Sequence, residues 1–550
     1  MNSDSNWKLD ECLKSFQSEK APKNEKEFYT KSFNLFLKFY TITKDLNLTG
    51  ITEQTKQVIE DVIWEYNTLC HSYSPKAHLT KVWDLVLILY FSTQNDSYID
   101  PLSDWLNQYY PVDPASPTKL YQFIVRGDWT MALDELNTLK EQEAERDQWA
   151  VEKVMEEIER WSQVEGIDKW TEWREQVSSG LDRSQLTPVL LRVYAILLGD
   201  EEGGCEGLGL LDRLLAIGRF SRPGIPLIEL QSVGQRIYET TDPLDKTCAY
   251  LLMGLLDDGL SYSNDLWLET HLGHAFISVD VKLAQTFQLS NVQAIVDPVY
   301  LSMNEYVKTI VAKEDMWQEA IIYLSTCKEN GQDWMIKLLG DPPLNEKKVE
   351  FIKEILAIAY EYQLNDVQRV LHNALGKRQE GMGDRHQAVI EYTRAQNVDA
   401  LNRLSLVELN DYLDKGKLND VVTLREVEIS QRYSLLVKYH HFRTLVNQKE
   451  YKQASHVLLE LVENKELLPM QYEIVFMIDT LEILKDKENH YSFEQYLKWI
   501  ELFKSIERDE SKHAFISKYY KFVHQVDLSS HLILTRLREL LSYKASLSQQ

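Results

Sequence analysis

The sequence predicts an all-α protein built as an irregular α-solenoid, and three observations carry this prediction. Pro (14) and Gly (21) are scarce in 550 residues, whereas all-β sandwiches and propellers need a turn residue about every 8 to 12 positions. Apolar residues recur at spacings of three and four along most of the chain, as on one face of a helix. A short aromatic–Ala–Leu pattern also recurs in three separated segments.

Composition and charge exclude several classes of protein. Hydrophobic residues make up 44% and charged residues 26% of the chain, which is typical of a folded protein and argues against wholesale disorder. The net charge is −25, from 85 acidic and 60 basic residues. Because a phosphate-binding groove needs clustered Lys and Arg, and no such cluster occurs, we expect protein partners and no direct nucleic-acid binding.

Compartment and membrane topology can also be judged from the residues. The five cysteines lie far apart and form no C-x-x-C pair, which predicts free buried thiols in a reducing compartment. The first residues show no basic region followed by an apolar run, so we expect no secretory signal. The most apolar stretch, 82–92, contains Asp84 and is far shorter than the ~20 residues that span a bilayer. We therefore predict a buried helix there.

The predicted elements follow in chain order. Residues 28–40 place Phe28, Phe33 and Phe36 on one face of a helix. The acidic stretch 140–176 keeps apolar residues at helical spacings, which indicates solvated helices. The Gly- and Pro-containing stretch 200–226 is predicted to be a surface loop.

Two further helices are predicted in the C-terminal half, over 347–362 and 530–547, because apolar residues form a stripe in each. Helices average about 11 to 12 residues and their connections about 2 to 8, so a chain of this length should hold roughly 25 to 30 helices. A single bundle cannot organise that many helices, which favours a stack.

The recurring aromatic–Ala–Leu pattern supports a stack of helix pairs. In each copy an aromatic residue is followed three positions later by Ala and four further on by Leu, after a charged or Gly-containing turn. These positions share one helix face, and the small Ala lets a neighbouring helix approach. The irregular spacing excludes a regular 34-residue tetratricopeptide array; chance recurrence of common residues is the alternative. The three triads are Trp129, Ala132 and Leu136; Trp317, Ala320 and Leu324; and Tyr451, Ala454 and Leu458.

No catalytic, cofactor-binding or metal-binding residue is predicted. His271 and His274 are three residues apart, but no carboxylate or Cys with ligand spacing stands nearby, which favours structural histidines. Asp257 and Asp258 could start a magnesium site in a helical enzyme, but Ser261 occupies the next-turn position where a second carboxylate would complete it. A helical metal-dependent enzyme is therefore a weak alternative.

Read in order, several segments resemble a known family. Pro243-Leu244-Asp245 leads a helix, and it is followed by 267–272, by 316–324, by Pro343-Leu344-Asn345, by Arg394-Ala395 and by 439–461. In this collinear order the chain resembles the scaffold nucleoporins of the Nup eighty-five (also Nup seventy-five) family, which belong to the Y-shaped complex of the nuclear pore.

The resemblance implies a fold, a function and partners. The fold would be a fold-back α-solenoid of the ancestral coatomer element type, with trunk, crown and tail. The function would be a structural scaffold of the outer ring of the nuclear pore complex at the nuclear envelope, supporting transport of protein and mRNA. The partners would be a WD40 β-propeller subunit and other Y-complex nucleoporins. The family completes that propeller with an N-terminal blade, whereas residues 1–27 here are polar and contain no β-rich runs.

These expectations define three segments: a polar, flexible segment at 1–27, a solenoid of trunk and crown at 28–485, and a helical tail at 486–550. In the tail, Leu534, Leu537 and Leu541 are the candidate partner interface, although the same leucines could pack within the tail. The alternative function is that of another helical scaffold, such as a vesicle-coat subunit or a tetratricopeptide-like adaptor.

Overall fold

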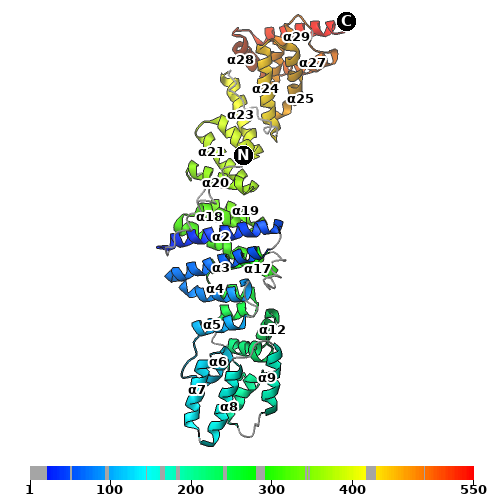
Figure 1. Ribbon diagram of the computed structural model, residues 1–550. Coiled ribbons are helices and arrows are strands. Elements are labelled where there is room, and N and C mark those ends of the chain that lie inside the picture. Colours follow the sequence, from blue (N-terminus) through cyan, green and yellow to red (C-terminus); the bar gives the residue numbers. More distant parts are fainter. Residues whose placement is uncertain are drawn as a thin grey trace. The chain divides into compact units, whose positions relative to one another are not determined.

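The computed structural model is all-helical in the part of the chain that it describes (Figure 1). It describes residues 22–549 except 50–51, 93–97, 144, 162–166, 181–185, 239–244, 280–291, 341–343, 345–346, 416–428 and 489. These residues form 27 α-helices and no β-strand, within the expected range. No helix in these ranges is both long enough and apolar enough to cross a membrane. The chain divides into two compact units, residues 1–323 and 324–550.

Some predicted features lie outside the described residues. They are most of the polar segment 1–27, Cys12, and Pro243, Leu244, Pro343 and Asn345 of the segments that carry the family resemblance. The four described cysteines are buried thiols outside any disulfide, as predicted: Cys70, Cys205, Cys248 and Cys327.

Unit 1 contains two runs of helices. The outward run is α2 (Glu25–Thr49), α3 (Glu53–Ser72), α4 (Thr80–Val86), α5 (Ile99–Tyr109), α6 (Lys119–Arg126), α7 (Trp129–Gln142), α8 (Glu145–Trp161) and α9 (Ile167–Gly180). The returning run is α10 (Pro188–Leu197), α11 (Leu210–Ala216), α12 (Leu227–Ile237), α13 (Lys246–Leu252), α14 (Leu256–Tyr262), α15 (Leu266–Ser278), α17 (Val292–Glu314) and α18 (Trp317–Ser325). The boundary between the units falls within α18.

The chain reverses direction within unit 1. Helix α6 contacts α10 and α11, α5 contacts α11, α4 contacts α13, and α2 contacts α15. As the helix number falls along the outward run, its partner's number rises along the returning run, so the two runs lie antiparallel. Polar bonds tie the runs together: the Lys81 ammonium lies 3.0 Å from the Asp245 carboxylate, and the Tyr90 hydroxyl donates to the Leu251 carbonyl.

Aromatic side chains fill the core where the two runs meet. Trp83 stacks on Tyr66 at 5.0 Å between ring centroids, and Trp267 packs on Phe28 at 5.1 Å. The Trp267 indole N–H donates to the Ser32 hydroxyl over 2.8 Å, so its one polar group is satisfied although the side chain is buried. These contacts join α2, α3, α4 and α15 around one core.

Unit 2 is built differently, because its helices pack mainly on their neighbours in sequence. A single hydrophobic core runs from Ala388 to Ala545. The helices of unit 2 are α19 (Lys328–Leu339), α20 (Val349–Glu361), α21 (Asn365–Gly381), α22 (Arg385–Arg394), α23 (Val398–Lys415), α24 (Gln431–Asn447), α25 (Tyr451–Glu463), α26 (Tyr472–Leu484), α27 (Phe493–Glu507), α28 (His513–His524) and α29 (Ser530–Leu547).

The same tight turn joins several helix pairs. One residue adopts a left-handed conformation, as at Gly127 (φ 73°), Asp315 (φ 57°) and Lys449 (φ 64°), and the next N–H bonds back to a carbonyl in the preceding helix. The following helix starts at once, so the two helices lie side by side. These backward bonds run from Asp128 to Phe123 (2.9 Å), from Met316 to Ile310 (3.4 Å) and from Glu450 to Leu445 (3.0 Å).

The sequence predictions for individual elements are mostly confirmed, with one error. The stripe at 347–362 forms α20, and 530–547 forms α29 with the predicted bounds. The prediction of a surface loop over 200–226 is wrong. That stretch contains α11 (Leu210–Ala216) and a π-helical turn (Ile217–Ser221), both largely buried. Apart from the buried Gly218, Gly and Pro lie toward the two ends of this stretch, and the apolar run between them forms a helix with a buried face.

Candidate interaction surfaces

The three predicted triads lie at corresponding places in three helices. Each occupies the first two turns of the second helix of a pair: α7, α18 and α25. The Ala and Leu members are fully buried, namely Ala132, Leu136, Ala320, Leu324, Ala454 and Leu458, and the aromatic members Trp129, Trp317 and Tyr451 are partly buried. The triads therefore pack helix against helix inside the chain and do not form an exposed surface.

A fourth helix pair has the same geometry but does not match the aromatic–Ala–Leu pattern in sequence. In α22, Arg385 takes the aromatic position, and Ala388 and Tyr392 are buried at the next two. A Cβ added to Gly376 in α21 would lie 2.8 Å from the Tyr392 ring, so the two helices approach closely there. A search that required only the turn and the buried Ala would have found this copy.

The C-terminal leucines face the chain's own core. Leu534, Leu537 and Leu541 are 5%, 1% and 1% exposed, and α29 packs on α26, α27 and α28. The opposite side of α29 exposes Leu532 (56%) and Tyr543 (60%). A partner that binds folded α29 meets these two side chains, whereas the three leucines become accessible only when α29 separates from the unit.

A buried lysine fixes α29 in place. The Lys544 side chain is buried, and its ammonium donates to the carbonyl oxygens of Asp486 (2.6 Å) and Glu488 (2.9 Å), just after α26. Because an ammonium group has three N–H donors, these bonds satisfy most of its capacity away from water. Helix α29 is thereby held against the turn that follows α26.

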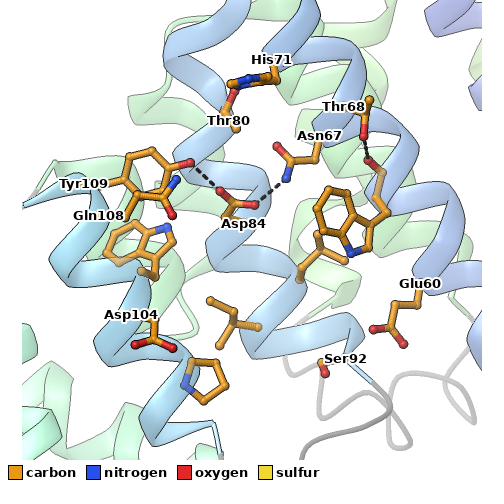
Figure 2. Close-up of a pocket in the computed structure, with 15 residues that line it drawn as sticks. Glu60, Asn67, Thr68, His71, Thr80, Asp84, Ser92, Asp104, Gln108 and Tyr109 are labelled. Carbon is orange, nitrogen blue, oxygen red and sulfur yellow. Dashed lines mark hydrogen bonds between the residues drawn. The ribbon is translucent and has the colours of Figure 1, made fainter. Parts of the chain in front are cut away.

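Unit 1 has a groove lined by residues of three helices. It has a volume of about 710 Å³ and lies across α3, α4 and α5 (Figure 2). Its floor includes the buried Leu87 and Trp105, and Trp64, which is 55% exposed, lines it as well. A large exposed aromatic beside an apolar floor is typical of protein-binding sites.

Asp84 is central to this groove. Asn67 Nδ2 and the Tyr109 hydroxyl both donate to its carboxylate, one from each side (Figure 2). Asp104 and Glu60 also line the groove, and none of its lining residues is Lys or Arg. In the sequence, Asp84 is a lone acid within the apolar stretch 82–92, and this was the available signal for the site.

The residues weighed as metal ligands in the sequence, two histidines and two aspartates, do not form a common site. His271 Nδ1 donates to the Trp267 carbonyl (2.8 Å), and Nε2, which carries no proton in the neutral ring, accepts from the Tyr323 hydroxyl (2.9 Å). Burial lowers the pKa of both His271 and His274 to about 3, so both rings are neutral near pH 7. Asp257 and Asp258 are exposed in the first turn of α14.

One group of side chains in the described residues has the spacing of metal ligands: Asp486, Glu488 and His490, whose ligand atoms lie within 4.8 Å of one another. His490 Nε2 already bonds to the Asp486 carboxylate, and the Lys544 ammonium lies on the carbonyls of the same turn. Two of the three side chains, Asp486 and His490, are therefore already paired with each other.

Taken together, the fold and its surfaces place the chain among proteins built from stacked helices. The described residues form stacked helix pairs, the candidate catalytic side chains are buried in cores or isolated, and the recesses are open grooves between helices. Such proteins act by presenting helix faces and grooves to partners.

Comparison with known proteins names the family. A model described as Nup85 nucleoporin matches residues 10–505, so the chain belongs to the Nup85 nucleoporin family. It is 21% identical over 348 residues to nuclear pore complex protein Nup85 of Xenopus tropicalis and 23% identical over 352 residues to that of Homo sapiens, in each case over 60% of this chain and 52% of the relative. It is 22% identical to nuclear pore complex protein Nup75 of Drosophila melanogaster over 494 residues, 79% of this chain and 71% of the relative. The chain thus spans about half the length of the vertebrate relatives.

Proposed function

We propose that the chain is a structural scaffold subunit of the nuclear pore complex, which supports pore assembly and the transport of protein and mRNA between nucleus and cytoplasm. The observation that carries the proposal is the family match over 10–505. The relatives that match this chain are nuclear pore complex proteins by name. In this proposal the protein lies at the nuclear envelope and acts by holding partners in place.

The architecture suits such a role. A rigid scaffold needs contacts between its helices that resist deformation. Packed helices provide such contacts, because side chains in protein interiors are close-packed. Helices α2 and α15 of unit 1, which are far apart in sequence, share one aromatic core. Local fraying of the outward run is therefore resisted by the returning run.

Finer assignments belong to the same proposal. The fold would be of the ancestral coatomer element type, with trunk and crown within 28–485 and a tail at 486–550, in the outer-ring Y complex. The antiparallel runs of unit 1 support the fold-back part of this assignment. The partners would be a WD40 β-propeller subunit and other Y-complex nucleoporins. Helix α29 would contribute to a partner contact at the tail, and the buried Leu534, Leu537 and Leu541 would take part in that contact only when α29 separates from the unit.

Localisation and partners test the proposal. The full chain is tagged with a fluorescent protein at its own locus, and free fluorescent protein serves as the control. We expect a signal at the nuclear rim and co-purification of nuclear pore proteins, including a WD40 propeller. A diffuse cytosolic signal contradicts the proposal. A vesicle pattern with coat subunits among the purified proteins supports the vesicle-coat alternative instead.

A further inference from the structure

We propose that the groove across α3, α4 and α5 binds an arginine side chain presented by a segment of a partner protein. The proposal rests on the chemistry of the groove and not on the family match. Three features support it: a carboxylate whose hydrogen-bond donors are neutral, a buried amide oxygen that accepts no hydrogen bond, and an exposed indole.

The first feature is the charge of the groove. The Asp84 carboxylate is hydrogen-bonded by two neutral groups, the Asn67 amide and the Tyr109 hydroxyl. Asp104 is exposed and lines the same groove, and the described lining residues include no Lys or Arg. Neutral donors hold a carboxylate in position but do not neutralise its charge. The groove therefore attracts a cation and repels an anionic ligand such as a phosphate.

The second feature is an oxygen without a partner. Asn67 is 3% exposed, and its Oδ1 accepts no hydrogen bond. A buried polar atom without a partner costs about 1–3 kcal/mol. Because Asn67 Nδ2 donates to Asp84, Oδ1 of the same amide lies beside the Asp84 carboxylate. A ligand that brings several N–H donors to Asp84 reaches Asn67 Oδ1 after a small displacement of the side chains that cover it.

The third feature is Trp64, which lines the groove with more than half of its side chain exposed. A planar cation can stack on an indole while its edge donates to a carboxylate. The guanidinium group of arginine meets all three requirements, because it is planar, permanently charged and carries five N–H donors in a fixed fork. The ammonium group of lysine offers charge but neither the plane nor the fork.

A macromolecular partner fits better than free arginine. The groove extends over three helices and about 710 Å³, so a side chain and part of its flanking backbone can enter together. The apolar floor of Leu87 and Trp105 matches the aliphatic stem of arginine and its neighbours. The occupant is therefore an arginine with apolar neighbours in a loop or helix of another protein.

The test uses the full chain and a short acetylated polyalanine peptide with one central arginine. Matched peptides carry lysine or citrulline, the neutral isostere of arginine, at the same position. Binding is measured by saturation-transfer NMR and by titration at low salt. We expect the arginine peptide to bind more tightly than the lysine peptide and the citrulline peptide not to bind. Asp84→Asn should weaken arginine binding by about tenfold or more.

Controls separate binding from folding. Trp64→Ala should weaken arginine binding, whereas Trp149→Ala, which removes an indole of similar exposure (52%) from α8, should leave it unchanged. Both variants should keep the thermal midpoint of the parent chain, because both side chains are largely exposed. The proposal is overturned if the citrulline peptide binds as well as the arginine peptide, if no arginine peptide binds, or if Asp84→Asn leaves the affinity intact.

Discussion

A polar cluster inside the core of unit 2 illustrates what single residues contribute. The Asp479 carboxylate is fully buried and accepts hydrogen bonds from the hydroxyls of Tyr439 (2.8 Å) and Tyr519 (3.1 Å) and from the Arg443 guanidinium (3.1 Å). Burial raises the pKa of Asp479, and Arg443 with the two hydroxyls opposes that rise. The cluster joins α24, α26 and α28 through one side chain.

Removing the charge of Asp479 should destabilise unit 2 strongly. Asp479→Asn leaves the Arg443 guanidinium without its carboxylate and places an amide N–H against donors. We expect a loss of about 3–5 kcal/mol in the free energy of unfolding, the usual cost of breaking a buried ion pair. Urea unfolding followed by circular dichroism measures this loss.

The matched control is Glu460→Gln, which breaks the exposed pair between Lys438 and Glu460. Its cost should be about 0–1 kcal/mol, because water screens such pairs. If the two variants lose the same free energy of unfolding, the buried cluster contributes no more to stability than an exposed ion pair.

At the scale of elements, the left-handed turns decide how helix pairs pack. Gly383 joins α21 to α22 with φ 84°, and a Cβ at this position would meet nothing within 4 Å. Gly381, at the end of α21, also has open space around it but does not have a positive φ. The two glycines therefore differ mainly in backbone conformation.

Alanine at these two positions should have opposite effects on stability. Gly383→Ala should destabilise the chain by about 1–2 kcal/mol, because an L-residue with a Cβ is strained in the left-handed region. Gly381→Ala should stabilise it by up to about 0.5–1 kcal/mol, because alanine loses less backbone entropy in a helix. Thermal midpoints of both variants check this prediction, and a stabilising Gly383→Ala would contradict the role given to the turn.

At the scale of the whole molecule, the division into two units predicts how the chain unfolds. Each unit is compact, and the core of unit 2 is continuous from Ala388 to Ala545. Leu537 is 1% exposed in that core. Leu537→Ala should therefore cost about 2–5 kcal/mol, the usual loss for a buried leucine.

Calorimetry should show this loss in only one of two unfolding transitions. The transition that belongs to unit 1 should keep its midpoint in Leu537→Ala, because distant sites contribute independently. Leu532→Ala, on the exposed side of α29, is the control and should move neither transition appreciably. A single transition that shifts as a whole would mean that the two units unfold as one.

Much of the fold could be predicted from the sequence, because the signals are local. The stripe of apolar residues predicted α20 and α29, and the triads of an aromatic residue, Ala and Leu predicted helix pairs whose Ala and Leu are buried. The stretch 200–226 was mispredicted because Gly and Pro at its ends outweighed Leu210 and Leu211 between them. Its Asp212 pairs with Arg126 in the interior at 2.7 Å, a contact 86 residues apart that no local pattern indicates.

By itself, the sequence determined that this protein is helical, where three of its helix pairs turn, and which family it resembles. The first two depend on residues within a few helical turns of one another, and the third depends on the order of short segments along the chain. Only the tertiary structure decided that α2 packs against α15, that Leu534, Leu537 and Leu541 face inward, and that Asp84, Asn67 and Trp64 share a groove. The physical reason is that many amphipathic helices have similar apolar faces, so the choice among partners depends on side-chain packing over the whole chain.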